Sequence, residues 1–153
     1  MITLLLILHG LTAVALLGAV SHQAASLFFR QTTPGGAFVS RYARVDAGRF
    51  TVPVIWLYLV VFVLGSVIYP AYRVDVRIPF EELGLLWAVG LFEIKEHAGG
   101  IGVFVLPLYA VAWRSAGDPS TLTDRRMITA FIAGVVWFDF IAGHLLNNIR
   151  GLA

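Results

Sequence analysis

The chain has 153 residues, of which 59% are hydrophobic and 13% charged, and its mean hydropathy is +0.84. Soluble domains are roughly 45–50% apolar and about 25% charged, so this composition excludes a soluble globular protein and indicates a single integral membrane domain. Cysteine is absent, which excludes disulfides, thiolate metal sites and cysteine-ligated iron–sulfur clusters on this chain. The net charge of +2 does not indicate nucleic-acid binding, because the arginines flank apolar runs.

The first predicted transmembrane helix covers residues 2–29, a stretch without a formal charge that exceeds the roughly 20 residues needed to cross a bilayer. No Lys or Arg precedes Arg30, so the stretch lacks the basic start of a cleaved signal peptide. We expect it to remain as an uncleaved signal anchor. A polar linker from Arg30 to Phe50, with breaker residues Thr32–Gly36, leads to a second predicted span over residues 51–72.

The third predicted span is preceded by a short loop at residues 73–79 and by Pro79-Phe80-Glu81-Glu82, a pattern typical of a helix start. The apolar pattern then continues to Arg114, interrupted by charges near residue 95. Two interpretations are open: one long tilted helix, or an interfacial helix over residues 83–95 followed by a span beginning near Glu96. In both, residues from about Ile94 to Trp113 make the third crossing, within a predicted segment that covers residues 83–114.

A polar turn at residues 115–124 separates this segment from a fourth predicted span over residues 126–149. The sequence therefore predicts an all-α integral membrane four-helix bundle in the bacterial cytoplasmic membrane. Lysine and arginine are more frequent on the side of the bundle that carries the linker at residues 30–50 and the turn at residues 115–124. The positive-inside rule places that side in the cytoplasm and both termini outside. The cytoplasmic set is Arg30, Arg41, Arg44, Arg49, Arg114, Arg125 and Arg126; the outer set is Arg73, Arg77, Lys95 and Arg150.

Three of the four histidines are expected at one depth. With 1.5 Å of rise per residue, His9, His97 and His144 lie roughly 7, 9 and 10 Å from the midplane, all toward the outer face. Two neutral imidazoles on separate helices at one level are the ligands that a bis-histidine haem b requires. In a ring of four helices taken in order, the first and third are diagonal, which favours His9 and His97 as the ligands and leaves His144 on a neighbouring helix. Pairing of His9 or His97 with His144 also stays open, and a three-histidine copper site or purely structural histidines are the alternatives.

Small residues flank each of these histidines. They allow helices to approach closely, and they would also leave room for a flat macrocycle beside an axial imidazole. We therefore count them among the candidate cofactor-binding positions: Gly10, Gly99, Gly100 and Gly143.

Charged residues near the same level are candidates for proton transfer, quinone contact or propionate binding. Glu93 shares a helical face with His97, and a carboxylate near a ligating histidine can orient its ring or accept a proton. Asp139 lies near the centre of the fourth span, where an ionisable side chain indicates function by default. The full set of proton or quinone candidates is Glu93, Glu96 and Asp139, and the propionate candidates are Arg73, Arg77 and Arg150.

Four short spans with His-Gly or Gly-His pairs resemble small bacterial membrane cytochromes b and CopD-like copper-resistance membrane proteins. The segment from His144 to Arg150 also resembles the His-x-x-Asn-Gly-Ile-Arg run of succinate dehydrogenase cytochrome b subunits, with Asn148 in place of the glycine. The resemblance implies a haem-binding or copper-handling bundle.

The sequence thus predicts a subunit that carries electrons through one haem b near the outer face, within a larger respiratory or photosynthetic complex. Its expected partners are lipid, other subunits and a periplasmic electron carrier, and quinone is an expected electron source. No nucleotide-binding motif is present. A copper-handling protein and a cofactor-free assembly subunit are the two rival hypotheses.

Overall fold

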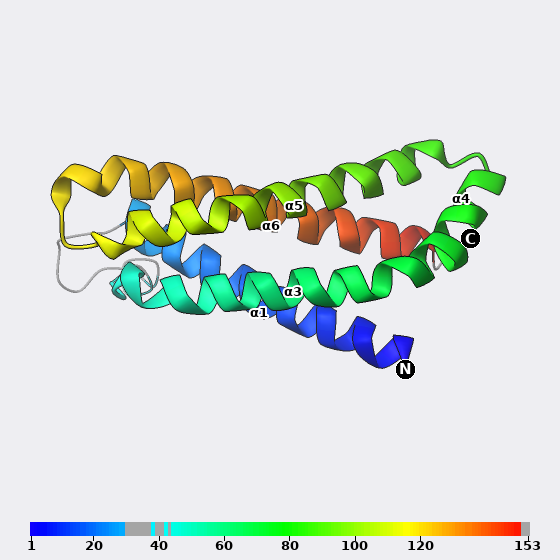
Figure 1. Cartoon of the computed structure of the whole chain (residues 1–153), viewed down its shortest axis with the longest axis horizontal. Helices are drawn as coiled ribbons and strands as arrows, with labels where there is room; N and C mark the ends of the chain where they lie inside the picture. Colours follow the sequence, from blue (N-terminus) through cyan, green and yellow to red (C-terminus); the bar gives the residue numbers. More distant parts are fainter. Residues whose placement is uncertain (30–37, 39–41, 43, 151–153) are drawn as a thin grey trace.

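The computed structural model describes residues 1–29, 38, 42 and 44–150, except for the side chain of Arg150. Four long helices form the body of the protein: α1 (Ile2–Phe28), α3 (Thr51–Tyr72), α5 (Leu86–Arg114) and α6 (Leu122–Arg150). They lie side by side as a bundle (Figure 1). The described part of the chain is all-helical, as predicted from the sequence.

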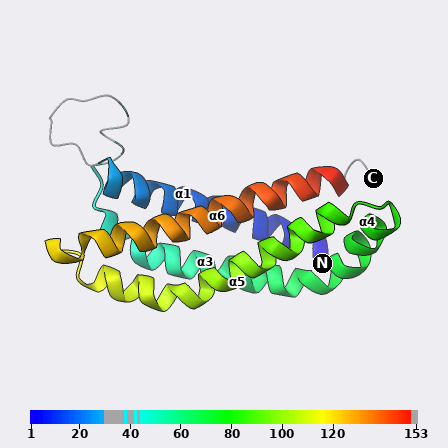
Figure 2. The ribbon, with the colours of Figure 1, turned by 90° about the horizontal axis from the view of Figure 1, so that it is seen from above.

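Each long helix has two neighbours. Helix α1 packs against α3 and α6, and α5 packs against α6 and, less extensively, against α3, so α1 and α5 lie diagonally opposite. Figure 2 shows this arrangement from above. The start of α1 and the end of α6 lie at the same end of the bundle as the short helix α4 (Ile78–Glu82), which we call the α4 end.

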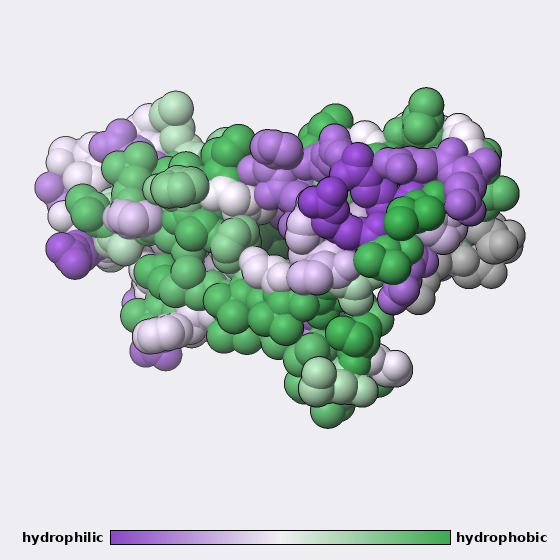
Figure 3. All heavy atoms as spheres, turned by 45° about the vertical axis from the view of Figure 1, so that its right-hand side comes forward, coloured by the Kyte–Doolittle hydropathy of each residue, from purple (hydrophilic) through white to green (hydrophobic). Residues whose placement is uncertain are grey.

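Three segments are long and apolar enough to cross a membrane: Ile2–Phe28, Ala47–Glu82 and Pro119–Ile149. Their outward faces expose large apolar side chains, among them Leu11, Trp56 and Ile141. Green, apolar residues cover the protruding N-terminal end of α1 in Figure 3. Helix α5 is as long as α6, but Glu93, Lys95 and Glu96 make its first half less apolar.

The loop expected at residues 73–79 is wrong, because the chain stays helical there. A π-helical turn, η2 (Arg73–Arg77), joins α3 directly to α4, which begins with Ile78 and Pro79. The reversal comes later, at Gly84, which has a positive φ of 71°. Helix α5 then runs without a break from Leu86, so residues 83–95 do not form a separate helix.

A buried polar network closes the bundle at the end opposite α4. Gln23 is fully buried; its side-chain oxygen accepts a hydrogen bond from the Tyr109 hydroxyl, and its amide donates to the carbonyl of Ala47 and to Thr51. The short 3-10 helix η1 (Ala47–Phe50) before α3 supplies that carbonyl. The breaker residues predicted at 32–36 lie outside the described part of the chain.

Candidate functional site

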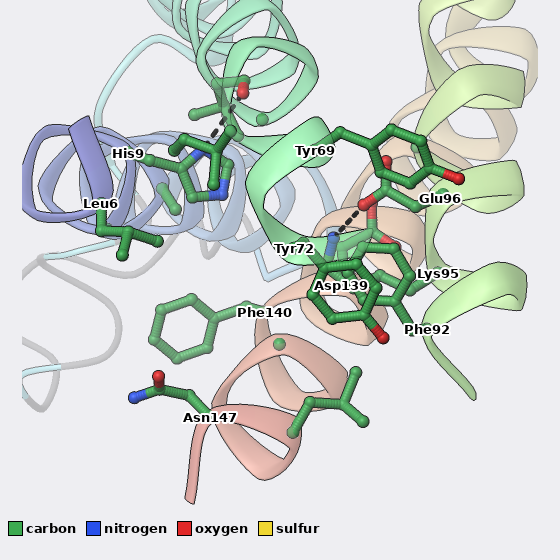
Figure 4. A pocket seen from close by; sticks show the side chains of 18 of the residues that line it. Leu6, His9, Tyr69, Tyr72, Phe92, Lys95, Glu96, Asp139, Phe140 and Asn147 are labelled. Carbon is green, nitrogen blue, oxygen red and sulfur yellow. Dashed lines mark hydrogen bonds and ion pairs between the residues drawn. The ribbon is translucent and has the colours of Figure 1, made fainter. Parts of the chain in front are cut away.

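A cavity of about 520 Å³ opens between all four long helices, in the half of the bundle nearer the α4 end. Its volume falls within the roughly 300–1,000 Å³ range of small-molecule and cofactor sites. The wall is mainly apolar and aromatic, and a few polar side chains project from it (Figure 4). Seven of the sequence-predicted site residues line it: His9, Gly10, Glu96, Gly99, Asp139, Gly143 and His144.

The charged segment of α5 divides into two helical faces. Phe92, Lys95, Glu96 and Gly99 follow a spacing of three and four residues, and all of them line the cavity. Glu93 is four residues before His97 on the other face, and both are exposed. The charged segment of α5 therefore directs only half of its polar side chains into the cavity.

Helix α6 repeats the same spacing with Val136, Asp139, Phe140, Gly143 and Asn147, all of which line the cavity. The heptad-like stripe makes one continuous face of α6 the floor of the site. Phe140 and Asn147 project from this helix in Figure 4. Asn147 was not among the predicted site residues, and the stripe is the signal that would have identified it.

At the interface of α5 and α6, a polar side chain of each helix packs against a glycine of the other. A Cβ on Gly99 would lie 3.0 Å from Oδ2 of Asp139, and a Cβ on Gly143 would lie 3.4 Å from Cε of Lys95. Each helix thus places a polar side chain over a glycine of its neighbour, one helical turn apart. The two glycines set the position of Lys95 and Asp139.

The same use of glycine recurs on α3 and α5. Gly65 lies under the His9 ring, where a Cβ would be 3.3 Å from Cε1. Gly102 lies under the Tyr58 ring, and a Cβ there would overlap the hydroxyl. Gly10 and Gly100, by contrast, have no such neighbour within 4 Å. Four of the glycines near the cavity therefore accommodate polar side chains, a role that the sequence did not reveal.

His9 is held by the backbone of α3. Its Nδ1–H donates a hydrogen bond of 3.1 Å to the carbonyl of Val61, an interaction drawn as a dashed line in Figure 4. Because a carbonyl only accepts, Nδ1 carries the proton, and in the neutral ring Nε2 retains its lone pair. Such a bond to a backbone carbonyl is the usual arrangement that orients a metal-ligating histidine.

His144 and His97 differ in their surroundings. His144 lines the cavity from α6, although much of its side chain is exposed, and its ring lies parallel to Phe140 with centroids 6.2 Å apart. His97 does not line the cavity; its Nδ1–H donates to the carbonyl of Glu93, 2.6 Å away on its own helix. The structure therefore brings His9 and His144 to one cavity and leaves His97 outside it.

The charged groups of the cavity are one ion pair, the separate carboxyl of Asp139 and, at the exposed edge, the carboxyl of Asp75. Nζ of Lys95 lies 2.8 Å from Oε1 of Glu96, with the Lys95 side chain only 18% exposed. Oδ1 of Asp139 is buried and has no hydrogen-bond partner among the described residues. Buried polar atoms are nearly always paired, so an atom of this kind beside a cavity is available to whatever fills the cavity, water or a larger molecule.

An aromatic stack forms the wall between α3 and α5. Tyr72 and Phe92 lie face to face with centroids 3.5 Å apart, and Tyr69 packs 6.0 Å from Phe92. Nζ of Lys95 lies 5.3 Å from the Phe92 centroid. The Tyr72 hydroxyl is the second buried polar atom without a partner among the described residues. Lys95 and these three rings are wall residues that the sequence reasoning missed.

The arginines predicted to bind propionates are elsewhere. Arg77 pairs with Glu81 at 2.7 Å and with Glu93 at 3.3 Å, which ties η2 to α4 and α5. Arg73 lies over the Tyr69 ring, 6.0 Å from its centroid. Neither of these two arginines lines the cavity, whereas Lys95 does. The side chain of Arg150 lies outside the described part of the chain.

Within the described residues, no group of three or more His, Asp or Glu side chains is placed to hold a metal ion by itself. A site for two axial imidazoles is a different arrangement, because it needs only two protein ligands. No protein-family model matches the sequence, and the chain shows no significant similarity to a curated protein or to a solved structure. The argument for function therefore rests on the cavity.

Proposed function

We propose that the protein is a four-span membrane subunit that binds one b-type haem between His9 and His144. The observation that carries this proposal is that two histidines from neighbouring helices, α1 and α6, line one cavity of about 520 Å³. The hydrogen bond from His9 to Val61 supports it, because that bond leaves Nε2 free to act as a ligand. A bound haem would supply one-electron transfer between ferric and ferrous iron.

The chain's own residues would hold and enclose the macrocycle. Apolar and aromatic side chains of the wall would pack against its faces, and they would exclude water from the iron. The cation nearest to a propionate in this cavity would be Lys95, in place of the three arginines predicted from the sequence. Electrons would enter from a partner subunit, a periplasmic carrier or quinol, as inferred from the absence of a nucleotide-binding motif.

The proposed setting is the bacterial cytoplasmic membrane, with both termini outside. Helix α5 would be the fourth crossing, since it is 29 residues long and packs along the full bundle between α3 and α6. Its charged residues would be accommodated because Lys95 and Glu96 neutralise each other and face the cavity. Copper handling and a cofactor-free assembly role are the alternatives that the experiment must separate.

The test is the visible spectrum of the protein purified from cells supplied with haem precursor. We expect reduced-minus-oxidised Soret and alpha bands typical of a bis-histidine haem b, lost in His9→Ala and His144→Ala. His97→Ala and His22→Ala are matched controls, since neither residue lines the cavity, and both variants should retain the bands. Loss of the bands in His97→Ala would contradict the assignment. Copper without haem in the purified protein would support the copper-handling alternative. The absence of both copper and haem would support the cofactor-free assembly role.

A further inference from the structure

The wall of the cavity carries more negative than positive groups. Its charged residues are three carboxyl groups, Asp75, Glu96 and Asp139, and one ammonium group, Lys95. Because Lys95 and Glu96 form a contact of 2.8 Å, their charges largely cancel. Asp75 is exposed, whereas Asp139 lies deeper, against Gly99. Asp139 is therefore the group whose charge is left for an occupant to balance.

The position of Asp139 suits contact with such an occupant. Its Oδ2 is pressed against the backbone of α5 at Gly99, and its Oδ1 is buried without a partner among the described residues. Figure 4 shows the side chain on the side of the cavity where Lys95, Glu96 and Tyr72 converge. A neighbouring positive charge favours the ionised form of a carboxyl and compensates for its removal from water.

The remaining wall suits a flat, apolar ring system. Tyr69, Tyr72 and Phe92 present one stacked aromatic surface, and Phe140 contributes another ring from α6. Aromatic faces attract cations as well as other rings. The shape of the wall and its excess of negative charge thus favour a flat aromatic ligand that carries a positive charge.

We propose that Asp139 is the counter-ion for a positively charged, flat ring system bound in this cavity, and that the cavity discriminates against an uncharged ring of the same shape. The proposal rests on the proposed function and deepens it: the ferric iron-porphyrin centre of haem carries one positive charge, apart from its two propionates, whereas a quinone carries none. The carboxylate would stabilise the oxidised, positively charged state relative to the reduced one.

The first test uses the protein without haem. Ethidium serves as the flat aromatic cation and phenanthridine, its uncharged parent ring, as the neutral probe, in equilibrium dialysis against purified protein. We expect Asp139→Asn to weaken ethidium binding by about tenfold or more, the effect of losing one charge-assisted partner, and to leave phenanthridine binding unchanged. Glu82→Gln is the matched control, since Glu82 is exposed on α4 and does not line the cavity.

Equal weakening of both probes in Asp139→Asn would overturn the proposal, because it would indicate a change in cavity shape. Unchanged ethidium binding would overturn it as well. The second test is the midpoint potential of the haem-loaded protein, which should become more positive in Asp139→Asn and stay constant in Glu82→Gln. If the protein shows no haem spectrum but Asp139→Asn still weakens the binding of ethidium and not of phenanthridine, the proposed function alone is refuted. A haem spectrum with no discrimination and no shift in potential would refute this inference alone.

Discussion

Gly99 of α5 lies against Asp139 of α6, so closely that a Cβ on Gly99 would be 3.0 Å from Oδ2 of the carboxyl. One helical turn away, Gly143 of α6 lies under Lys95 of α5 in the reverse sense. The interface between these two helices is therefore built from two complementary pairs of a glycine and a charged side chain. This reciprocity places both charges at the cavity.

The first prediction concerns Gly99. Gly99→Ala should displace Asp139 and lower the free energy of unfolding by about 1–3 kcal/mol, the usual cost of overpacking, partly offset by the better helix propensity of alanine. Gly100→Ala is the matched control, because a Cβ on Gly100 meets nothing within 4 Å. We expect the control to be neutral or stabilising by up to about 1 kcal/mol. Denaturation in mixed micelles measures both, and equal effects would contradict the proposed packing.

The second prediction concerns the polar network that closes the other end of the bundle. The Tyr109 hydroxyl donates to the side-chain oxygen of Gln23, and Gln23 is fully buried. Gln23→Leu or Tyr109→Phe alone should each cost about 1–3 kcal/mol, because each change removes a buried hydrogen bond and leaves the remaining partner incompletely satisfied.

The double variant should be less destabilised than the sum of the two single variants, by at least about 0.5 kcal/mol. Unfolding of the four proteins completes this double-mutant cycle. Simple additivity would show that the two side chains do not interact in the folded protein. The spectrum expected of bound haem should remain in all four, since neither residue lines the cavity.

The third prediction concerns pH and the turn between α5 and α6. Hydrogen bonds from the Ser120 hydroxyl and from its backbone amide hold the pKa of the Asp118 carboxyl below its usual value. A carboxyl whose pKa is lower in the folded state stabilises that state above its unfolded pKa of about 3.9, and loses this effect as the pH falls through the folded value.

Asp118→Asn should therefore be less stable than the original protein at pH 6, and the difference should shrink as the pH falls below about 4. Unfolding midpoints measured from pH 6 down to pH 3 test this expectation. Asp124→Asn is the control, since it changes another exposed carboxyl near the start of α6. A gap that stays constant with pH would refute the role assigned to the Asp118 charge.

The fourth prediction concerns topology. Because the chain contains no cysteine, single cysteines can be labelled without background. With both termini outside, Glu82→Cys in α4 should react with a membrane-impermeant maleimide in intact cells. Ser120→Cys, in the short 3-10 helix η3 (Pro119–Thr121) at the other end of the bundle, should react only after lysis. The reverse pattern would invert the proposed orientation, and reaction of both in intact cells would contradict the membrane arrangement.

The elements of this fold were largely predictable from the sequence. Long uncharged runs predicted the positions of α1, α3 and α6 because a helix that meets lipid must be apolar on its outer surface and must satisfy its own backbone. The prediction of a loop at residues 73–79 is wrong because the charges of Arg73, Asp75 and Arg77 indicate the end of the apolar run and not the end of the helix. Charged side chains at the end of a membrane helix are equally compatible with a helix that continues beyond the apolar region.

The sequence by itself predicted an all-helical chain with four apolar spans, because composition and rise per residue act along the helix axis. The structure confirms the helices and shows three segments long and apolar enough to cross a membrane, while the common depth of His9, His97 and His144 stays a prediction. Only the tertiary structure decided which side chains meet, because that depends on how each helix is rotated. His97 and Lys95 are two residues apart on α5, yet one points outward and the other lines the cavity. That rotation is set by glycines that leave room for a side chain of a neighbouring helix. The pairs are Gly143 with Lys95, Gly99 with Asp139, Gly65 with His9 and Gly102 with Tyr58.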